Sequence, residues 1–141
     1  MVAYSFKGRF EDRIRARTKI QTIRAHGKKR HARPGERITM TTGDRFHPRL
    51  IGSGTCESVA PITLNFEYVT PGGRRRAAHV IVYLPAAGTM VIRAGDLDDF
   101  ARRDGFDDWA DLCAFWRKTH GDLKTFDGLL ILWGDSFQAA A

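Results

Sequence analysis

Thr18-Lys19-Ile20-Gln21-Thr22-Ile23-Arg24, followed shortly by Arg33-Pro34-Gly35-Glu36-Arg37-Ile38, is the part of the sequence that decides the expected fold. The first segment brings an amine, Lys19, and a hydroxyl, Thr22, close together along the chain. A basic loop follows, and the Pro-Gly pair of the second segment is typical of a turn that starts a new strand. The order of parts is therefore a helix end, a strand, a basic loop, a turn and another strand.

Apolar spacing assigns the elements on either side of this segment. Phe10 and Ile14 lie one helical turn apart and indicate a short helix over Arg9–Arg17, whose polar side carries the arginines at positions 9, 13 and 17. Ile38 and Met40 alternate with polar residues, as in a half-buried strand. Strands are expected over 2–6, 21–24 and 36–42, whereas 43–54 is expected to be irregular.

The middle of the chain is rich in β-forming residues and turn signals. One or two strands are expected over 55–69, where Pro61 indicates a sheet edge or a bulge. Pro71-Gly72-Gly73 predicts a turn beside the triple arginine Arg74–Arg76. Those arginines either reach a nucleic-acid backbone or only keep the end of a hairpin soluble. Further strands are expected over 79–84 and 90–93.

Two helices and a last strand are expected near the C-terminus. Asp96 is placed to cap a helix that runs through Arg103, and Asp107 is placed to cap a second helix over 108–119. The second helix has an apolar stripe that should face the core, formed by Trp109, Leu112, Cys113 and Trp116. A last strand is expected over Phe126–Trp133, and it should be central because its run Leu129–Leu132 is apolar on both faces. The residues after Gly134 should fray.

These parts resemble the ASCH domains of the PUA-like superfamily. In that family a short helix ends at a Lys-Thr-x-Thr-x-Arg type motif, and a polar loop then leads to a Pro-Gly-Asp/Glu turn that opens the next strand. The chain departs from the motif at Ile20 and matches it at Lys19, Thr22, Ile23, Arg24, Pro34, Gly35 and Glu36. The segment Phe100–Phe106, followed by a helix with Trp109 and Leu112, resembles the family's acidic-Gly-aromatic segment before its last helix.

The resemblance implies an α+β fold, with a small curled sheet or pseudo-barrel and two or three helices at its rim. The length of 141 residues suits one domain that builds a core without disulfides or metals. We therefore expect one ASCH/PUA-like domain over 1–134. The middle stretch is longer than such a domain needs, so an inserted hairpin is expected around 55–93, and the tail over 135–141 is expected to be frayed.

The resemblance also implies a set of catalytic residues. Bacterial ASCH proteins that remove the acetyl group from N4-acetylcytidine use a lysine, a threonine and a glutamate, which map onto Lys19, Thr22 and Asp104. Aspartate is one methylene shorter than glutamate, so its carboxylate would lie about 1.5 Å further back. Residues three apart in a strand point to opposite faces, so Lys19 and Thr22 meet only if the backbone turns between them.

Positive charge is concentrated in the first part of the chain. Residues 1–50 carry a net charge of +10 and residues 51–141 carry −3, within the total of +7. A basic half suggests a polyanion partner, most often nucleic acid, although it is also compatible with a solvated basic face. The loop over 25–33 is expected to be exposed, either as a phosphate-contacting lip or as a solubilising loop. The expected nucleic-acid contacts are Arg24, Lys28, Lys29, Arg30 and Arg33.

Three functions fit these residues. The first is binding of RNA or a modified nucleoside in a basic cleft, with an aromatic side chain such as Phe46 or Tyr68 stacking on a base. The second is hydrolysis of N4-acetylcytidine-like substrates, in which Lys19 is the base for Thr22, and Arg24 or a backbone N–H holds the oxyanion. The third is RNA cleavage. In the plain structural alternative, Thr22 is a satisfied strand hydroxyl and Lys19 is one lysine of a basic face.

Several other classes of protein are not expected. Cys56 and Cys113 are too few for a disulfide framework and lack CxxC spacing, and the histidines of the basic loop have no metal-ligand pattern. The chain has no run of about 18 apolar residues and no apolar N-terminal region, so neither a membrane span nor a signal peptide is expected. We expect a cytoplasmic protein with RNA or a modified nucleoside as its partner, and with no metal or cofactor.

Overall fold

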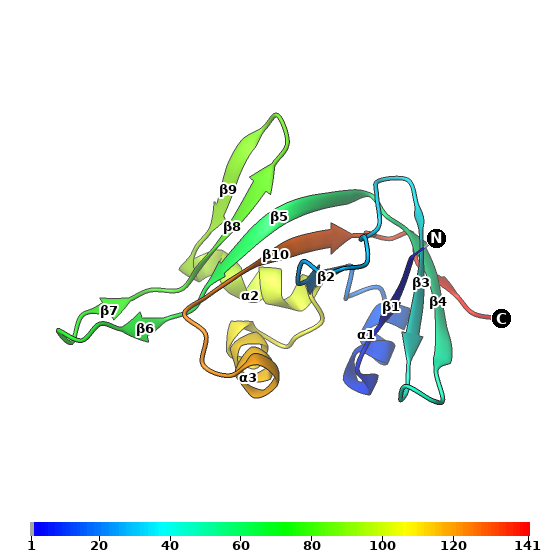
Figure 1. Cartoon of the computed structure of the whole chain (residues 1–141), viewed down its shortest axis with the longest axis horizontal. Coiled ribbons are helices and arrows are strands. Elements are labelled where there is room, and N and C mark those ends of the chain that lie inside the picture. Colours follow the sequence, from blue (N-terminus) through cyan, green and yellow to red (C-terminus); the bar gives the residue numbers. More distant parts are fainter. Residues whose placement is uncertain (1) are drawn as a thin grey trace.

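Two sheets, a small two-stranded ribbon and three α-helices form the computed structural model, which describes residues 2–141 (Figure 1). The α+β class expected from the sequence is confirmed. Strand pairing is antiparallel except between the first strand and its neighbour. Within residues 2–141 both sheets remain open, so they do not form a closed barrel.

The smaller sheet contains the N-terminal strand and the end of the chain. Its strand order is β1-β3-β4-β11. Ile38 and Met40 on β3 are fully buried, as their alternation predicts. The strands span β1 Val2–Ser5, β3 Arg37–Thr42, β4 Arg49–Thr55 and β11 Gln138–Ala139.

The larger sheet has the order β2-β10-β5-β8-β9. The expectation of a central last strand is confirmed, because β10 pairs with β2 on one side and with β5 on the other. Pro61 lies on β5 just before Ile62, where pairing with β8 begins, so that side of the strand is open at the proline. The strands span β2 Gln21–Arg24, β5 Ser58–Asn65, β8 His79–Leu84, β9 Gly88–Ile92 and β10 Thr125–Leu132.

The helices lie against the inner side of the larger sheet and beside the smaller one. Figure 1 shows α2 and α3 below the long strands β5 and β10, with α1 next to β1. Phe100 and Leu112 are buried from α2 and α3, whereas Trp109 and Cys113 of the expected core stripe are only half-buried. The helical elements are the 3-10 turn η1 Gly8–Phe10, α1 Glu11–Arg15, α2 Ala94–Arg103 and α3 Trp109–His120.

Both predicted helix caps were misplaced. Asp96 lies inside the first turn of α2, whose N-cap is Arg93 with no capping side chain. At α3 the cap is Asp108 rather than Asp107, because the Asp108 carboxylate accepts a hydrogen bond of 2.8 Å from the backbone N–H of Asp111. Because Asp107 and Asp108 are adjacent and chemically identical, the sequence alone does not show which of them caps the helix.

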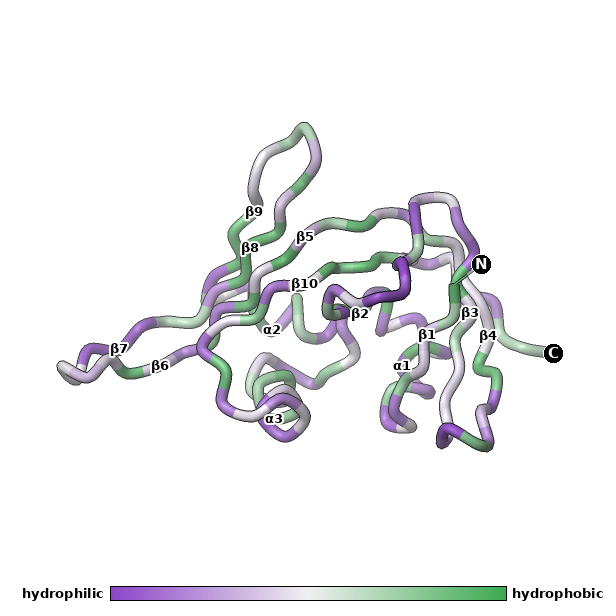
Figure 2. Tube along the Cα trace, viewed as in Figure 1, coloured by the Kyte–Doolittle hydropathy of each residue, from purple (hydrophilic) through white to green (hydrophobic). Residues whose placement is uncertain are grey.

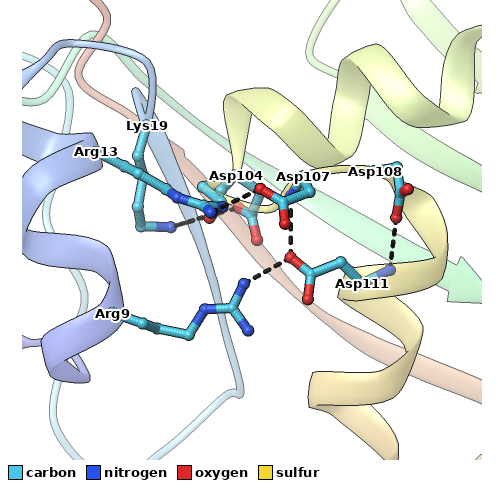
Figure 3. A network of polar contacts seen from close by, with 8 residues as sticks. Arg9, Arg13, Lys19, Asp104, Asp107, Asp108 and Asp111 are labelled. Atoms are coloured by element: carbon cyan, nitrogen blue, oxygen red, sulfur yellow. Dashed lines mark hydrogen bonds and ion pairs between the residues drawn. The ribbon is translucent and has the colours of Figure 1, made fainter.

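The arginine stripe of the first helix faces protein rather than solvent alone. Arg9 forms a 2.5 Å ion pair with Asp111, and Arg13 forms a 2.7 Å ion pair with Asp107 (Figure 3). Arg13 also donates to the Gly105 carbonyl at 2.5 Å. These contacts join η1 and α1 to α3 and to the residues just before it, so two of the three arginines expected on the polar side of the first helix are neutralised within the fold.

Two segments expected to be irregular are ordered as strands. Residues 43–54 contain most of β4, and the tail over 135–141 is not frayed, because β11 pairs with β4 and Phe137 is buried. Gly52 explains the close pairing, since a Cβ there would overlap the Gln138 carbonyl and the Phe137 ring. Glycine lowers strand propensity, and this close approach between distant segments leaves no local pattern in the sequence.

Two hairpins project from the larger sheet. Strands β6 (Tyr68–Val69) and β7 (Arg75–Arg76) form one of them, and its turn lies between Thr70 and Arg74. Strands β8 and β9 form the other, and Figure 2 shows apolar residues along both of its strands. The part of the chain within 2–141 contains no helix with the length and apolarity needed to span a membrane.

Candidate functional site

A cleft of ≈ 300 Å³ lies where β1, η1, β2, α3 and β10 meet. Its walls are largely aromatic, with Phe6, Phe10, Phe106, Phe115, Trp116 and Phe126. The polar side chains in it are Lys7, Lys19, Thr22, Arg24, Asp104, Thr119 and His120, together with Ser5. The volume is at the lower end of the range of about 300–1,000 Å³ that is typical of small-molecule sites.

Lys19, Thr22 and Asp104 all line this cleft. The backbone turn needed for that arrangement is present, because Arg17 has φ 65° after α1 and the N–H groups of Thr18 and Lys19 both donate to the Arg13 carbonyl. The next residue, Ile20, donates to the Arg103 carbonyl at 2.9 Å and so ties this turn to the end of α2. The fold thus brings together residues from opposite ends of the chain.

The Lys19 ammonium is held by two backbone carbonyls. Its Nζ donates to Asp104 O at 2.5 Å (Figure 3). It also donates to Gln21 O at 2.8 Å and lies 4.9 Å from the centre of the Phe10 ring. The residue is only 2% exposed. Burial is the main reason that the pKa of Lys19 is lowered to about 8, with the attraction of Asp104 opposing it and Arg24 and Arg9 adding to it.

Asp104 carries the opposite perturbation. Its Oδ1 lies 3.9 Å from Lys19 Nζ, which is an ion-pair contact but too long for a hydrogen bond. Burial raises the pKa of Asp104 to about 6, while Lys19, the Gln21 amide and Arg24 act to lower it. Asp104 Oδ1 and Gln21 Nε2 are both buried without a completed hydrogen bond in the described chain. Titratable groups perturbed in this way are concentrated at functional sites.

Gly105 gives Lys19 the space that its stem occupies. The residue has φ +95°, and a Cβ there would lie 2.7 Å from Lys19 Cδ and 3.0 Å from Phe10 Cδ1. Only glycine adopts this backbone conformation without strain and also leaves that volume empty. Gly105 therefore ends α2 and also fixes the distance between α2 and the lysine.

Arg24 is a mostly buried cation that lines the cleft from the end of β2. Its Nε donates to Thr22 Oγ1 at 3.1 Å, and one terminal nitrogen donates to Ser5 O at 2.9 Å. The guanidinium lies 4.9 Å from the Phe6 ring centre and 5.0 Å from that of Tyr4. Burial lowers its pKa, although an arginine remains protonated at neutral pH.

Thr22 is placed by β2 and is 5% exposed. Its hydroxyl oxygen accepts the hydrogen bond from Arg24. Among the side chains of residues 2–141, no hydrogen bond joins Lys19 to Thr22, because the lysine donates to the two carbonyls instead. The predicted residues therefore share one cleft, and their catalytic roles remain a prediction.

The other four predicted nucleic-acid contacts lie outside the cleft, on the exposed loop after β2. Arg30 is partly neutralised there, since it forms two hydrogen bonds of 2.8 and 2.5 Å with Glu36. Lys28, Lys29 and Arg33 are exposed to solvent. Ala25, the first residue of the loop, lines the cleft, so the loop begins at its rim.

Neither Phe46 nor Tyr68, the aromatic residues predicted to stack on a base, lines this cleft. Phe46 is 80% exposed in the turn between β3 and β4, and Tyr68 lies in a different cleft. The aromatic rings that line the cleft come from separate parts of the chain, and no local motif connects them. One pair of cleft residues does have a local signal in the sequence. Trp116 and His120 are one helical turn apart on α3, and their ring centres are 4.5 Å apart.

The described residues contain no group of three or more histidine, cysteine, aspartate or glutamate side chains arranged to hold a metal ion. Comparisons of the chain with protein-family models, curated proteins and solved structures found no match.

Proposed function

We propose that the chain is an ASCH-type domain of the PUA-like superfamily that binds a modified nucleoside, free or within RNA, in the cleft around Lys19. The observation that carries the proposal is the combination of a buried lysine, a mostly buried arginine and a buried carboxylate with several aromatic rings in one cleft of ≈ 300 Å³. Burial of the Lys19 and Asp104 charges in a small protein costs free energy, so a functional reason for keeping them is expected.

The chemistry of the cleft matches that of a nucleobase. Aromatic rings offer flat faces for stacking, and stacking is worth about 1–3 kcal/mol per base. Asp104 supplies an acceptor for the N–H groups on the edge of a base, and the cations Lys19 and Arg24 supply donors for its carbonyl oxygens. The basic loop after β2 adds charge beside the cleft for a phosphate backbone.

Binding of N4-acetylcytidine, cytidine and uridine, measured by calorimetry, tests the proposal. We expect N4-acetylcytidine to bind, and Asp104→Asn to weaken its binding about tenfold or more, because the amide replaces an acceptor with a donor. Asp99→Asn is the matched control, since Asp99 is an exposed carboxylate on α2 that pairs with Arg102. If no nucleoside and no single-stranded RNA binds the wild-type protein, the proposal is wrong.

A second function, amide hydrolysis, is favoured by the lowered pKa of Lys19, about 8, beside Thr22. A neutral Lys19 would accept the Thr22 proton as Thr22 Oγ1 bonds to the acyl carbon. When the C–N bond breaks, the cytosine N4 nitrogen would take that proton from Lys19. Water would then hydrolyse the acetyl ester of Thr22 and release acetate. Lys19 must leave its carbonyl partners to act in this way.

Release of acetate from N4-acetylcytidine distinguishes an enzyme from a binding domain. If Lys19 activates Thr22, Lys19→Ala and Thr22→Ala should each abolish turnover, and the double variant should be little worse than either. In a binding domain no acetate appears, and Thr22→Ala should cost only about 0.5–1.5 kcal/mol of binding free energy. Shortened RNA in the same incubations would instead indicate the ribonuclease alternative, for which His120 is the histidine in the cleft.

A further inference from the structure

A second cleft of ≈ 300 Å³ lies on the other side of Trp116. It is formed by the C-terminal end of α3, the loop that leads to β10, and the base of the β6–β7 hairpin. Its walls include Phe66, Tyr68, Trp116, Arg117 and Lys124. No residue of this cleft belongs to the Lys19–Arg24 or Pro34–Glu36 motif.

Trp116 is the wall shared by the two clefts. On the side of the first cleft its ring lies 4.6 Å from that of Phe126 and 4.5 Å from that of His120. On the side of the second cleft it lies 6.2 Å from the ring of Phe66. A single buried indole therefore separates two hollows of equal volume, each with aromatic walls. That arrangement suits two neighbouring units of one ligand better than two unrelated molecules.

The charges around the second cleft favour an anionic occupant. Its two carboxylates are paired, Asp122 with Arg117 at 3.3 Å and Glu67 with Arg75 at 2.7 Å. Lys124 lies over the Tyr68 ring at 5.0 Å. In the described chain Lys124 takes part in no ion pair, and neither do the arginines beside Arg75 on the hairpin, Arg74 and Arg76. The surplus around this cleft is therefore positive.

We propose that the second cleft binds the nucleotide next to the one held in the first cleft, so that the ligand is a single-stranded RNA rather than a free nucleoside. This inference rests on the proposed function. The neighbouring base stacks on Tyr68, and Lys124 contacts the phosphate that joins the two nucleotides or the next one along. An aromatic platform with adjacent cations is the usual construction of a single-strand binding site.

The experiment compares N4-acetylcytidine with trinucleotides that carry it at the first, middle or last position. At low salt, at least one trinucleotide should bind the wild-type protein about tenfold or more tightly than the nucleoside, because another base stacks and another phosphate is contacted. Tyr68→Ala should remove most of that gain and leave the affinity for the nucleoside unchanged. Lys124→Gln should reduce the gain in trinucleotide affinity. It should also make the slope of log binding constant against log salt concentration shallower by about 0.7.

Lys118→Gln is the matched control, because Lys118 is an exposed lysine at the same end of α3 and lines neither cleft. It should leave both affinities unchanged. Equal affinities for nucleoside and trinucleotides would overturn the inference and leave the proposed function standing. So would a Tyr68→Ala variant that keeps the trinucleotide gain, or one that weakens nucleoside and trinucleotide binding equally. Absence of binding by every ligand would instead remove both proposals.

Discussion

Lys19 Nζ lies 3.9 Å from Asp104 Oδ1 in an environment where neither residue is more than 4% exposed. Burial acts on the two groups in opposite directions, lowering the pKa of the lysine to about 8 and raising that of the aspartate to about 6. Their mutual attraction only partly offsets this burial. Both groups therefore titrate much closer to neutrality than exposed side chains of the same types.

The stability of the protein should depend on the protonation of Lys19. Below about pH 8 the buried ammonium destabilises the folded state, and between about 8 and 10.5 the folded state releases the proton while the unfolded state keeps it. Because the unfolded state then binds more protons at this residue, the contribution of Lys19 to stability rises with pH across this window. The buried Cys113 thiol, whose pKa is raised to about 11, acts in the opposite direction above about pH 9 in the wild type and the variant alike. Urea unfolding should show that Lys19→Met removes this rise, which is on the order of 3 kcal/mol.

Lys118→Met is the comparison for that measurement, since it removes an exposed lysine from α3. Its free energy of unfolding should follow the wild-type dependence on pH. The prediction is wrong if Lys19→Met and the wild-type protein change in parallel between about pH 8 and 10.5. Such a result would mean that the ammonium is well solvated in the folded state.

Gly105→Ala should disturb the position of Lys19. The added Cβ would lie 2.7 Å from Lys19 Cδ, at a residue with φ +95°. Gly88→Ala separates the two effects, because Gly88 has φ +85° and open space around its Cβ position. The control should be destabilised by about 1–2 kcal/mol from backbone strain alone. Gly105→Ala should be destabilised by about 1–3 kcal/mol more, and ligand binding should weaken with it. Equal effects in the two variants would contradict the proposed contact.

How much of the fold the sequence predicts depends on the range of the interactions. Alternation placed β3, and a run that is apolar on both faces placed β10 in the centre of its sheet. The missed strand β11 depends on its pairing with β4 around Gly52, which lies far away in the chain, so no local pattern expresses it. Strand β4 pairs with its chain neighbour β3, but its glycines at positions 52 and 54 lower the strand propensity of that segment.

The candidate site also combines residues that local sequence predicts with residues that only the packing of the fold brings together. Resemblance to a family motif predicts Lys19, Thr22 and Asp104, and the fold places them in one cleft. The aromatic residues of the cleft walls could not be predicted from the sequence, because Phe10, Phe115 and their neighbours have the spacing of ordinary core residues of helices. Whether a buried aromatic ring faces the core or a cleft depends on how the helices pack on the sheet, and periodicity gives only the buried side.

Phe137→Ala should destabilise the protein strongly, although the residue lies near the C-terminus. Its ring is 2% exposed and packs at the position that Gly52 leaves open. Truncation of a buried phenylalanine costs about 3–5 kcal/mol. Gln138→Ala, an exposed change at the next residue, should alter the free energy of unfolding by about 0.5 kcal/mol or less. If chemical denaturation finds similar small effects for both, the end of the chain is not part of the core.

Salt dependence should distinguish the exposed lysines of the basic loop from its paired arginine. The logarithm of the binding constant for single-stranded RNA falls linearly with the logarithm of the salt concentration. The slope becomes shallower by about 0.7 for each phosphate that the protein no longer neutralises. Lys28 and Lys29 are exposed, whereas Arg30 forms two hydrogen bonds with Glu36. Lys28→Gln combined with Lys29→Gln should therefore flatten the slope more than Arg30→Gln alone. Unchanged slopes in the double variant would show that this loop does not contact RNA.

Asp104→Glu tests whether the carboxylate is too short for catalysis. The present separation of 3.9 Å from Lys19 Nζ exceeds hydrogen-bonding distance, and one more methylene extends the side chain by about 1.5 Å. If the amidohydrolase function holds, the longer side chain should raise the rate of acetate release from N4-acetylcytidine, because a misplacement near 1 Å can cost about a hundredfold.

The dependence of that rate on pH gives an independent readout of the same change. In the wild-type protein the rate should rise with pH and level off above about 8, where Lys19 becomes the neutral base. A closer carboxylate favours the ammonium, so Asp104→Glu should shift this midpoint to higher pH even as the maximal rate increases. Asp104→Asn, which keeps the shape and removes the charge, should shift it to lower pH. Thermal unfolding of each variant checks that the extra methylene is accommodated. A folded Asp104→Glu variant that binds N4-acetylcytidine and releases no acetate, together with an inactive wild type, would exclude the hydrolase and leave the binding function.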